Sequence, residues 1–501
     1  MRNASAIATQ EDFWRELGLP ERSSAWKARI AGGSGGPSRW AGQGRCFDDG
    51  AHLAWRLPLM LSTSSLTATA RRLLHLALLG AAVGVACWPF NLVDRWQDQL
   101  LRQLPAFTGG GWAAPSLILA SLPLLTMPLL LWLQAGRFRF GAGSGIPETI
   151  LCVEEPALAG RFLGGLPTVQ RLLLWGTASL SLMPLGREGP VVQMGSAVAH
   201  ALRRRFPALL ADMPADDVLA VAAGAGLAAG FNTPLMATVF VAEELTSRFQ
   251  MSLIWPALVC SAVAAGVSDL GGQPMFALGL LSQSFSEGSQ LALALAIGVA
   301  AGLIGALFGK LLLATRLWLS GRVRRQPLAT GLALGLALTL LMLLSGGASG
   351  GDGETLMSEM IASLDQRDAL LPRLALLLWR VVGPCLALGA GVPGGLIDPA
   401  FTIGALFGQG FGSLASLQGL GLAIGMTAAL AGATQLPVMS VIFALRLAGD
   451  QQLLPGMLLA AAIGAYMSRL LMGQPMYHAL TEPLREAFNS HSLPSSTPPD
   501  P

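Results

Sequence analysis

Five long apolar segments decide what this 501-residue chain can fold into. They cover residues 73–93, 112–133, 291–313, 327–344 and 374–390. About 20 apolar residues in a row form a helix long enough to cross the hydrocarbon core of a bilayer. Charged residues make up only 12% of the chain, whereas soluble domains contain about 25%. The sequence therefore predicts an all-α polytopic membrane protein embedded in a lipid bilayer.

Glycine and proline interrupt the other apolar stretches. The chain holds 61 glycines and 31 prolines, as expected for tightly packed and broken membrane helices. Basic residues follow two apolar stretches, at 203–205 and at 322–325. Because basic residues mark cytoplasmic helix ends, we expect these ends, and both termini, to face the cytoplasm.

The chain divides into three regions. Residues 1–70 are polar and include the run "GGSGGPSRWAGQG" at 33–45, so we expect a loosely ordered cytoplasmic extension. They lack the basic, apolar and small-residue layout of a cleaved signal peptide. Residues 71–485 form the predicted membrane domain. Residues 486–501 are expected to be a disordered tail, so no second domain is predicted there.

The chain resembles itself at an offset near 200 residues. The run "GREGPVVQMG" at 186–195 aligns with "GLIDPAFTIG" at 395–404, and "GFNTPLMATVFVAEEL" at 230–245 aligns with "ATQLPVMSVIFALRLA" at 433–448. Shared Gly- and Ala-rich composition is the alternative explanation. Membrane transporters commonly pair two related halves around a mid-membrane site built from broken helices.

Three Gly- and Pro-interrupted loops are candidates for holding an ion. They read "GAGSGIPET" at 141–149, "GREGP" at 186–190 and "GVPGGLIDP" at 391–399. Glycine lets backbone N–H groups approach a ligand, and proline in a first helical turn loses no needed donor. Helix N-termini carry free N–H groups and partial positive charge. Each loop alone could be a packing kink, but together the three predict an anion site.

These motifs resemble those of the CLC family of chloride channels and chloride/proton exchangers. The resemblance rests on "GSGIPE" at 143–148, "GREGP", "GGLIDP" at 394–399 and "GQPMYHAL" at 473–480, supported by residues 222–245. It implies the CLC fold, with two inverted-topology repeats of tilted, broken helices around a mid-membrane anion site. It also implies a homodimer with one pathway per subunit. The nucleotide-binding CBS domains of eukaryotic members are not expected, and a bacterial inner membrane is the expected location.

The resemblance assigns the anion ligands residue by residue. The hydroxyls of Ser144 and Tyr477 are expected to face the anion, and the backbone N–H groups of Leu396 and Ile397 to donate to it. Helix capping by Ser144 and a membrane-interface position for Tyr477 remain alternatives. The other expected site residues lie in the first two loops and are Gly145, Ile146, Gly186, Arg187, Glu188 and Gly189.

Glu188 resembles the family's gating glutamate. An ionised carboxylate is itself an anion and can block an anion position at the helix ends. Burial favours the protonated form, which no longer mimics chloride and can swing away. The alternative is a structural ion pair with Arg187. Glu244 resembles the inner proton glutamate of exchangers, and Glu243 is expected to assist proton transfer there; carboxylates on a solvated helix end are the alternative.

The third loop departs from the family pattern. Ile397 replaces an aromatic residue, and Asp398 stands where a small neutral residue is expected. Asp398 is interpreted as a helix N-cap, a second titrating group or a feature that weakens anion binding. The intact serine motif favours chloride, with bromide and nitrate as further anions. Because Glu244 is present, chloride/proton exchange is the first hypothesis and a passive voltage- or pH-gated chloride channel the second.

Other function classes fit the sequence less well. The run "GASG" at 347–350 matches the pattern of rhomboid-type intramembrane serine proteases, with Ser349 as nucleophile and His478 as base. "LSGGASGGDGE" reads more simply as a glycine-rich loop. The five histidines are far apart and show no metal-ligand spacing. We therefore expect no enzyme, no metal, no cofactor and no nucleic-acid partner.

Overall fold

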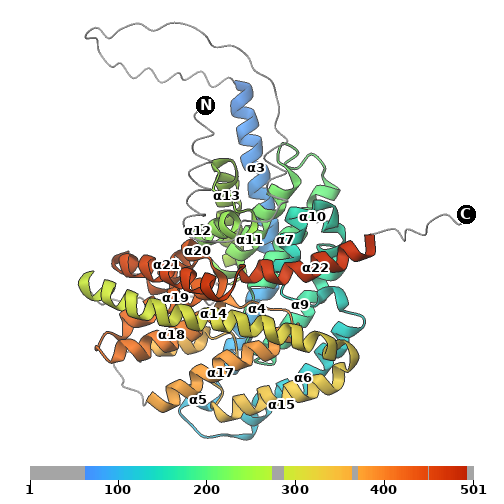
Figure 1. The fold of residues 1–501 in the computed structure, drawn as a ribbon. Helices are drawn as coiled ribbons and strands as arrows, with labels where there is room; N and C mark the ends of the chain where they lie inside the picture. The colour runs from blue at the N-terminus through green and yellow to red at the C-terminus, as the bar shows by residue number, and fades with distance from the viewer. Residues whose placement is uncertain (1–62, 273–286, 364–369, 450, 493–501) are drawn as a thin grey trace, which may run out of the picture. The chain divides into compact units, whose positions relative to one another are not determined.

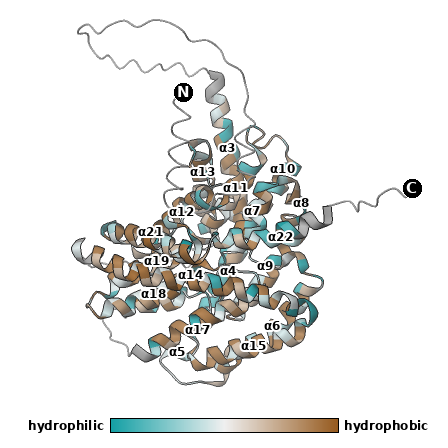
Figure 2. Cartoon of the chain, in the orientation of Figure 1, coloured by the Kyte–Doolittle hydropathy of each residue, from teal (hydrophilic) through white to brown (hydrophobic). Residues whose placement is uncertain are grey.

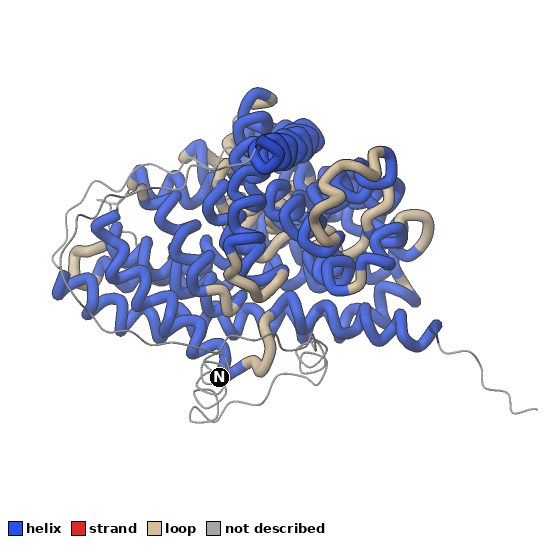
Figure 3. The backbone as a smooth tube through the Cα atoms, turned by 90° about the horizontal axis from the view of Figure 1, so that it is seen from above, coloured by secondary structure: helices blue, strands red, loops and turns tan. Residues whose placement is uncertain are grey.

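The computed structural model describes residues 63–272, 287–363, 370–449 and 451–492. Within these ranges every regular element is a helix, and the tube in Figure 3 shows helices and loops without a strand. Seven segments of this part of the chain are long and apolar enough to cross a membrane. The predicted all-α polytopic membrane architecture is confirmed.

The elements of the first half run from α3 to the turn that follows α12 (Figure 1). In chain order they are α3 Thr63–Ala86, α4 Trp88–Leu101, α5 Pro105–Thr108, α6 Ala114–Ala135, α7 Ile146–Glu154, α8 Ala159–Phe162, α9 Gly165–Leu180, α10 Glu188–Arg205, α11 Ala215–Phe231, α12 Pro234–Phe240 and a π-helical turn, Val241–Leu245.

The elements of the second half run from α13 to α22. They are α13 Met251–Leu270, α14 Glu287–Arg325, α15 Pro327–Leu344, α16 Glu354–Ala362, α17 Leu370–Gly389, α18 Ile397–Ser413, α19 Gln418–Thr434, α20 Pro437–Ala448, α21 Leu454–Leu471 and α22 Met476–Ser492.

The predicted segments agree with the helices to different degrees. The segment 327–344 coincides with α15, whereas α14 extends the segment 291–313 at both ends. Helix α3 begins before the predicted boundary at residue 71, and α22 continues past residue 485. Most of the predicted extension and tail lies outside the described residues. Helix α13 was not predicted as a span because Pro256 and polar residues interrupt its apolar run, and α21 because Ser468 and Arg469 shorten its run.

The internal repeat of the sequence is also a repeat of structure. The order α10, α11, α12 recurs as α18, α19, α20. Helix α11 ends at Asn232 and α19 at Gln435, both in the left-handed conformation with φ of +50° and +62°. In both halves a proline, Pro234 or Pro437, then opens the next helix. Matching backbone turns argue that the repeat reflects structure and not only composition.

Small residues bring α18 and α19 into backbone contact. A Cβ atom added to Gly408 would overlap the carbonyl oxygen of Gly421, and one added to Gly425 would overlap that of Gly404. Helices in membranes gain little from the hydrophobic effect on association, so close backbone approach through small residues replaces it. These helices are among the best-buried elements of the chain.

The outward face of α15 is a stripe of leucine. Leu328, Leu332, Leu336, Leu340 and Leu344 recur every fourth residue and are each 48–67% exposed. Figure 2 shows hydrophobic colour along α15 and the neighbouring α6. A soluble protein rarely exposes so large a continuous apolar surface. Lipid chains are the surroundings in which this stripe is stable.

We predict that Gly408→Leu destabilises the fold by about 1–3 kcal/mol or more, because the new side chain must separate α18 from α19. Thermal unfolding in detergent, followed by tryptophan fluorescence, measures this. Gly321→Leu in α14 is the matched control, since a Cβ there meets no atom within 4 Å. Equal melting temperatures for the two variants would contradict the packing argument.

Candidate functional site

Two loops from the two halves of the chain bond to each other at the candidate site. The N–H of Gly186 donates to the carbonyl of Gly395 at 3.0 Å, and the N–H of Gly395 donates to the carbonyl of Gly186 at 2.9 Å. Helix α10 begins two residues after the first glycine and α18 two residues after the second. This bridge therefore places the two helix N-termini beside each other.

The third predicted loop joins the same cluster. The N–H of Gly143 donates to the carbonyl of Gly391 at 2.9 Å. Gly145 has φ of +111°, and a Cβ there would overlap the carbonyl of Gly189 in the first turn of α10. Ile146, the first residue of α7, is buried. All three loops predicted from the sequence thus lie in contact, and only glycine permits the spacing between α7 and α10.

Glu188 lies on the N-terminal turn of α18. Its Oε1 atom accepts a hydrogen bond of 2.7 Å from the backbone N–H of Asp398, and the side chain is fully buried. A Cβ added to Gly186 or Gly395 would overlap this carboxylate. Leu396 and Ile397 are the amides expected to donate to a bound anion, and the Glu188 carboxylate binds the amide that follows them in the helix. A carboxylate thus occupies an anion position at a helix N-terminus.

The hydroxyls of Ser144 and Tyr477 are buried, and no described residue forms a hydrogen bond with either of them. Both side chains line a cavity of about 220 Å³, together with Leu396 from the third loop and Arg316 from α14. Tyr477 is fully buried, which argues against a place at the membrane interface. Glu148 also lines the cavity, so its wall carries charged groups of both signs beside the two unpaired hydroxyls.

Glu148 caps α7 in place of Ser144. The N–H of Gly145 donates to Oε2 of Glu148 at 2.9 Å, so the capping alternative for Ser144 is not what the structure shows. Arg171 holds the other carboxylate oxygen at 2.8 Å and donates to the carbonyl of Ala142 at 2.9 Å. None of the sequence motifs indicates this buried pair, although an arginine within the apolar run "PTVQRLLLW" is an available signal.

Arg187 pairs with acids other than Glu188. Its guanidinium forms an ion pair with Asp94 of α4 and lies 3.5 Å from Glu354 of α16. It also stacks over the ring of Phe231, 4.7 Å from the centroid. The structural ion pair considered for Glu188 is therefore not formed. Arg187 fixes the start of α10, and its partners were missed because they lie far away in the sequence.

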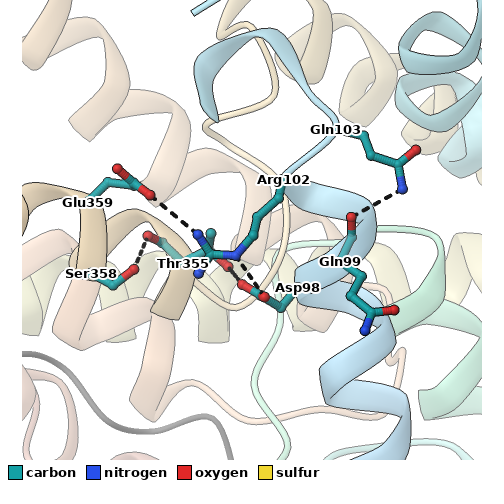
Figure 4. A network of polar contacts seen from close by, with 7 residues as sticks. All are labelled: Asp98, Gln99, Arg102, Gln103, Thr355, Ser358 and Glu359. Carbon is teal, nitrogen blue, oxygen red and sulfur yellow. Dashed lines mark hydrogen bonds and ion pairs between the residues drawn. The ribbon is translucent and has the colours of Figure 1, made fainter. Parts of the chain in front are cut away.

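A second set of polar contacts fixes α16 against α4. Asp98 accepts hydrogen bonds from Thr355 at 2.9 Å and from Arg102 at 2.8 Å, and Arg102 lies 3.4 Å from Glu359 (Figure 4). Asp98 lies one helical turn after Asp94, and Thr355 directly follows Glu354. Asp94 and Glu354 are the two acids that pair with Arg187. This network therefore supports the helices that carry the partners of Arg187.

Arg380 holds the glycine-rich loop before α16. Its guanidinium donates to the carbonyls of Ala348, Gly350 and Gly351 at 2.8–2.9 Å. In the same loop Ser345 donates its hydroxyl to Ser349 at 2.9 Å. The nucleophile considered for a protease is thus buried and bonded to a serine, which favours the simpler reading as a structural loop.

The two adjacent glutamates after α12 have different surroundings. Glu243 accepts hydrogen bonds from the N–H groups of Met439 at 2.9 Å and Val438 at 3.3 Å, so it caps α20. Glu244 is buried within the π-helical turn, with its Oε1 atom 3.7 Å from Nε2 of His478 in α22. Glu244 is therefore not a carboxylate on a solvated helix end.

The chain is similar to known anion transport proteins along most of its length. Residues 124–469 match the family described as voltage gated chloride channel. The H(+)/Cl(-) exchange transporter ClcA of Vibrio parahaemolyticus is 30% identical over 359 residues, which cover 68% of this chain and 74% of that protein. ClcA of Salmonella paratyphi A is 28% identical over 362 residues, covering 68% and 72%.

Solved structures show the same fold. A slow cyanobacterial Cl−/H+ antiporter has a TM-score of 0.68 at 23% identity, covering 84% of this chain and 99% of that one. A CLC-type fluoride/proton antiporter has a TM-score of 0.62, also at 23% identity, covering 83% and 98%. The described helices adopt the CLC fold that the sequence motifs predict.

We predict that Arg187→Leu destabilises the protein by about 3–5 kcal/mol, because it leaves Asp94 and Glu354 buried without a cation. The matched control is Arg102→Leu, which removes an arginine whose side chain is 46% exposed; its cost should stay below about 1 kcal/mol. Denaturant unfolding in detergent gives both values. A loss for Arg187→Leu as small as the control's would show that the pair does not hold α10 in place.

Proposed function

The chain belongs to the voltage gated chloride channel family, and we propose that it exchanges chloride for protons across the membrane. The observation that carries the proposal is the carboxylate of Glu188 on the N-terminal amide of Asp398. A chemical anion is present there, and protonation can remove its charge. The relatives named as H(+)/Cl(-) exchange transporters support the same activity.

Glu188 is the proposed gate. When ionised, it accepts the N–H of Asp398 and blocks the position at the start of α18. When protonated, its carboxyl group is neutral and is a weaker hydrogen-bond acceptor. Chloride then competes with it for the partial positive charge of the helix end. Chloride entry therefore requires proton uptake, which is the coupling that an exchanger needs.

The cavity beside Ser144 and Tyr477 is the proposed anion path. Their two hydroxyls and the N-terminal amides of α18 replace the water that chloride loses on entering the membrane. None of these donors carries a full charge, so an anion can leave as well as enter. We propose chloride as the main substrate and bromide and nitrate as further ones.

Glu244 is the proposed inner proton carrier. It is buried, whereas His478 beside it is one-third exposed at its side chain. Glu243 caps α20 and thereby holds the end of the turn that carries Glu244. A passive voltage- or pH-gated channel is the second candidate, but a buried carboxylate at this place has no function in it. We propose a homodimer in the inner membrane with one pathway per subunit and both termini in the cytoplasm.

The first test is proton movement in chloride-loaded liposomes. With voltage clamped by a potassium ionophore, an outward chloride gradient should drive protons inward against their own gradient. Glu188→Gln and Glu244→Gln should abolish this movement, and Glu244→Gln should keep chloride flux. Glu359→Gln, which changes a half-exposed carboxylate, should behave like the unaltered protein.

Fast chloride flux without uphill proton movement in the unaltered protein would refute exchange and favour the channel. Proton movement that persists in Glu188→Gln would refute the gate while leaving exchange intact.

A second test concerns the hydroxyls that line the cavity. Tyr477→Phe and Ser144→Ala should each weaken chloride binding about tenfold or more, because a hydrogen bond to a charged group contributes about 1.5–3 kcal/mol. Calorimetric titration with chloride measures this. Tyr466→Phe is the control, since the other tyrosine of the chain is 53% exposed. Unchanged affinity in both cavity variants would exclude their hydroxyls as ligands.

A further inference from the structure

Asp398 is the buried acid at the site that the proposed cycle does not yet use. It is 1% exposed and lies in the first turn of α18. Neither of its carboxylate oxygens has a hydrogen-bond partner among the described residues. The N-cap residue of α18 is Leu396, whose side chain forms no capping hydrogen bond. The interpretation of Asp398 as a helix cap is therefore wrong, because its side chain takes no helix N–H group.

The carboxylates of Asp398 and Glu188 both lie close to Gly186. A Cβ added to Gly186 would lie 2.7 Å from Oδ2 of Asp398 and would also overlap both carboxylate oxygens of Glu188. The two acids are further joined through the backbone, since the N–H of Asp398 binds Glu188. Two carboxylates this close in a buried site cannot both remain ionised without a cation between them.

The nearby cations are already engaged. The charged and titratable groups near Asp398 are Glu188 and Arg187 from the α10 segment, Asp352 and Glu354 from the α16 segment, and Tyr477 from α22. Arg187 pairs with Asp94 and Glu354, and Asp352 accepts the N–H of Glu354 at 3.0 Å.

Arg380, the other buried arginine of this region, bonds to three carbonyl groups. The pair formed by Glu188 and Asp398 is therefore left to be neutralised by a proton, since an uncompensated buried charge is strongly unfavourable.

We propose that Asp398 is a proton-binding residue of the exchange cycle that hands its proton to Glu188. This inference rests on the proposed function of Glu188 as the gate. In the closed state one proton resides on Asp398 and Glu188 is ionised on the helix N-terminus. The neutral acid holds the proton next to the group that must receive it.

Opening transfers this proton without any other reactant. The O–H bond of Asp398 breaks as a new O–H bond forms on Glu188, so the charge of the pair is unchanged. Glu188, now neutral, leaves the amide of Asp398. The carboxylate of Asp398 then binds one proton from the solution, and chloride enters between two neutral acids. Each opening thus takes up one proton, and each closing releases one as the Glu188 carboxylate returns to the amide of Asp398.

The test compares Asp398→Asn with Asp398→Glu in the liposome assay. Asparagine keeps the size of the side chain but binds no proton, so chloride-driven proton uptake should slow at least about tenfold, and the pH dependence of exchange should change. Glutamate restores a titratable carboxyl and should recover most of the rate. Asp398→Ala repeats the test if asparagine prevents folding, which size-exclusion chromatography and thermal unfolding reveal.

A Glu188→Ala background separates proton transfer from a structural or anion-binding effect. Without the gate, chloride flux no longer waits for a proton, so adding Asp398→Asn should change it less than about twofold. An effect of Asp398→Asn equally large with and without Glu188 would overturn the proposal, as would wild-type exchange and an unchanged pH profile in Asp398→Asn. Proton-coupled chloride flux in Glu188→Ala alone would instead refute the gate itself.

Discussion

The backbone N–H groups at helix N-termini need acceptors, and inside a membrane no bulk water supplies them. The structure meets part of this constraint by pairing Gly186 with Gly395 and by placing the Glu188 carboxylate on the amide of Asp398 in the first turn of α18. In the proposed exchange cycle a mobile anion replaces the carboxylate, because an amide at a helix end donates to either acceptor.

The buried charges of this chain separate into two classes. Among the described residues most are committed to architecture, since each fixes a loop, caps a helix or pairs with a buried arginine; they are Arg171, Arg187, Arg380, Asp94, Glu148, Asp352 and Glu354. Asp398 and Glu244 are bonded neither to a helix N-terminus nor to a buried arginine, and Glu188 binds only the single amide of Asp398. Burying a charge is unfavourable unless it is paired, so acids left without a partner of this kind are the ones available to bind and release protons.

The sequence predicted the parts of the site that lie within single loops. The glycines around Ser144 and Glu188 indicated loops whose backbone must approach another loop or a ligand closely. The burial of Tyr477 agrees with its place in a motif. What the sequence could not show is which distant residues meet. Asp94 and Glu354 are more than 250 residues apart, and nothing local to either indicates Arg187 as a shared partner. Asp398 was recognised as unusual, but its relation to Glu188 required the reciprocal bridge between the two halves.

That bridge also has a consequence for how the protein is made. Gly395 leaves the ribosome about 200 residues after Gly186, which at typical translation speeds is a delay of roughly 10–40 s. During this interval the first repeat has inserted while its open loop still lacks the strand-like partner that completes it. An unfinished chain therefore lacks the second partner of the bridge between Gly186 and Gly395, and the candidate site is complete only after the second repeat has been made.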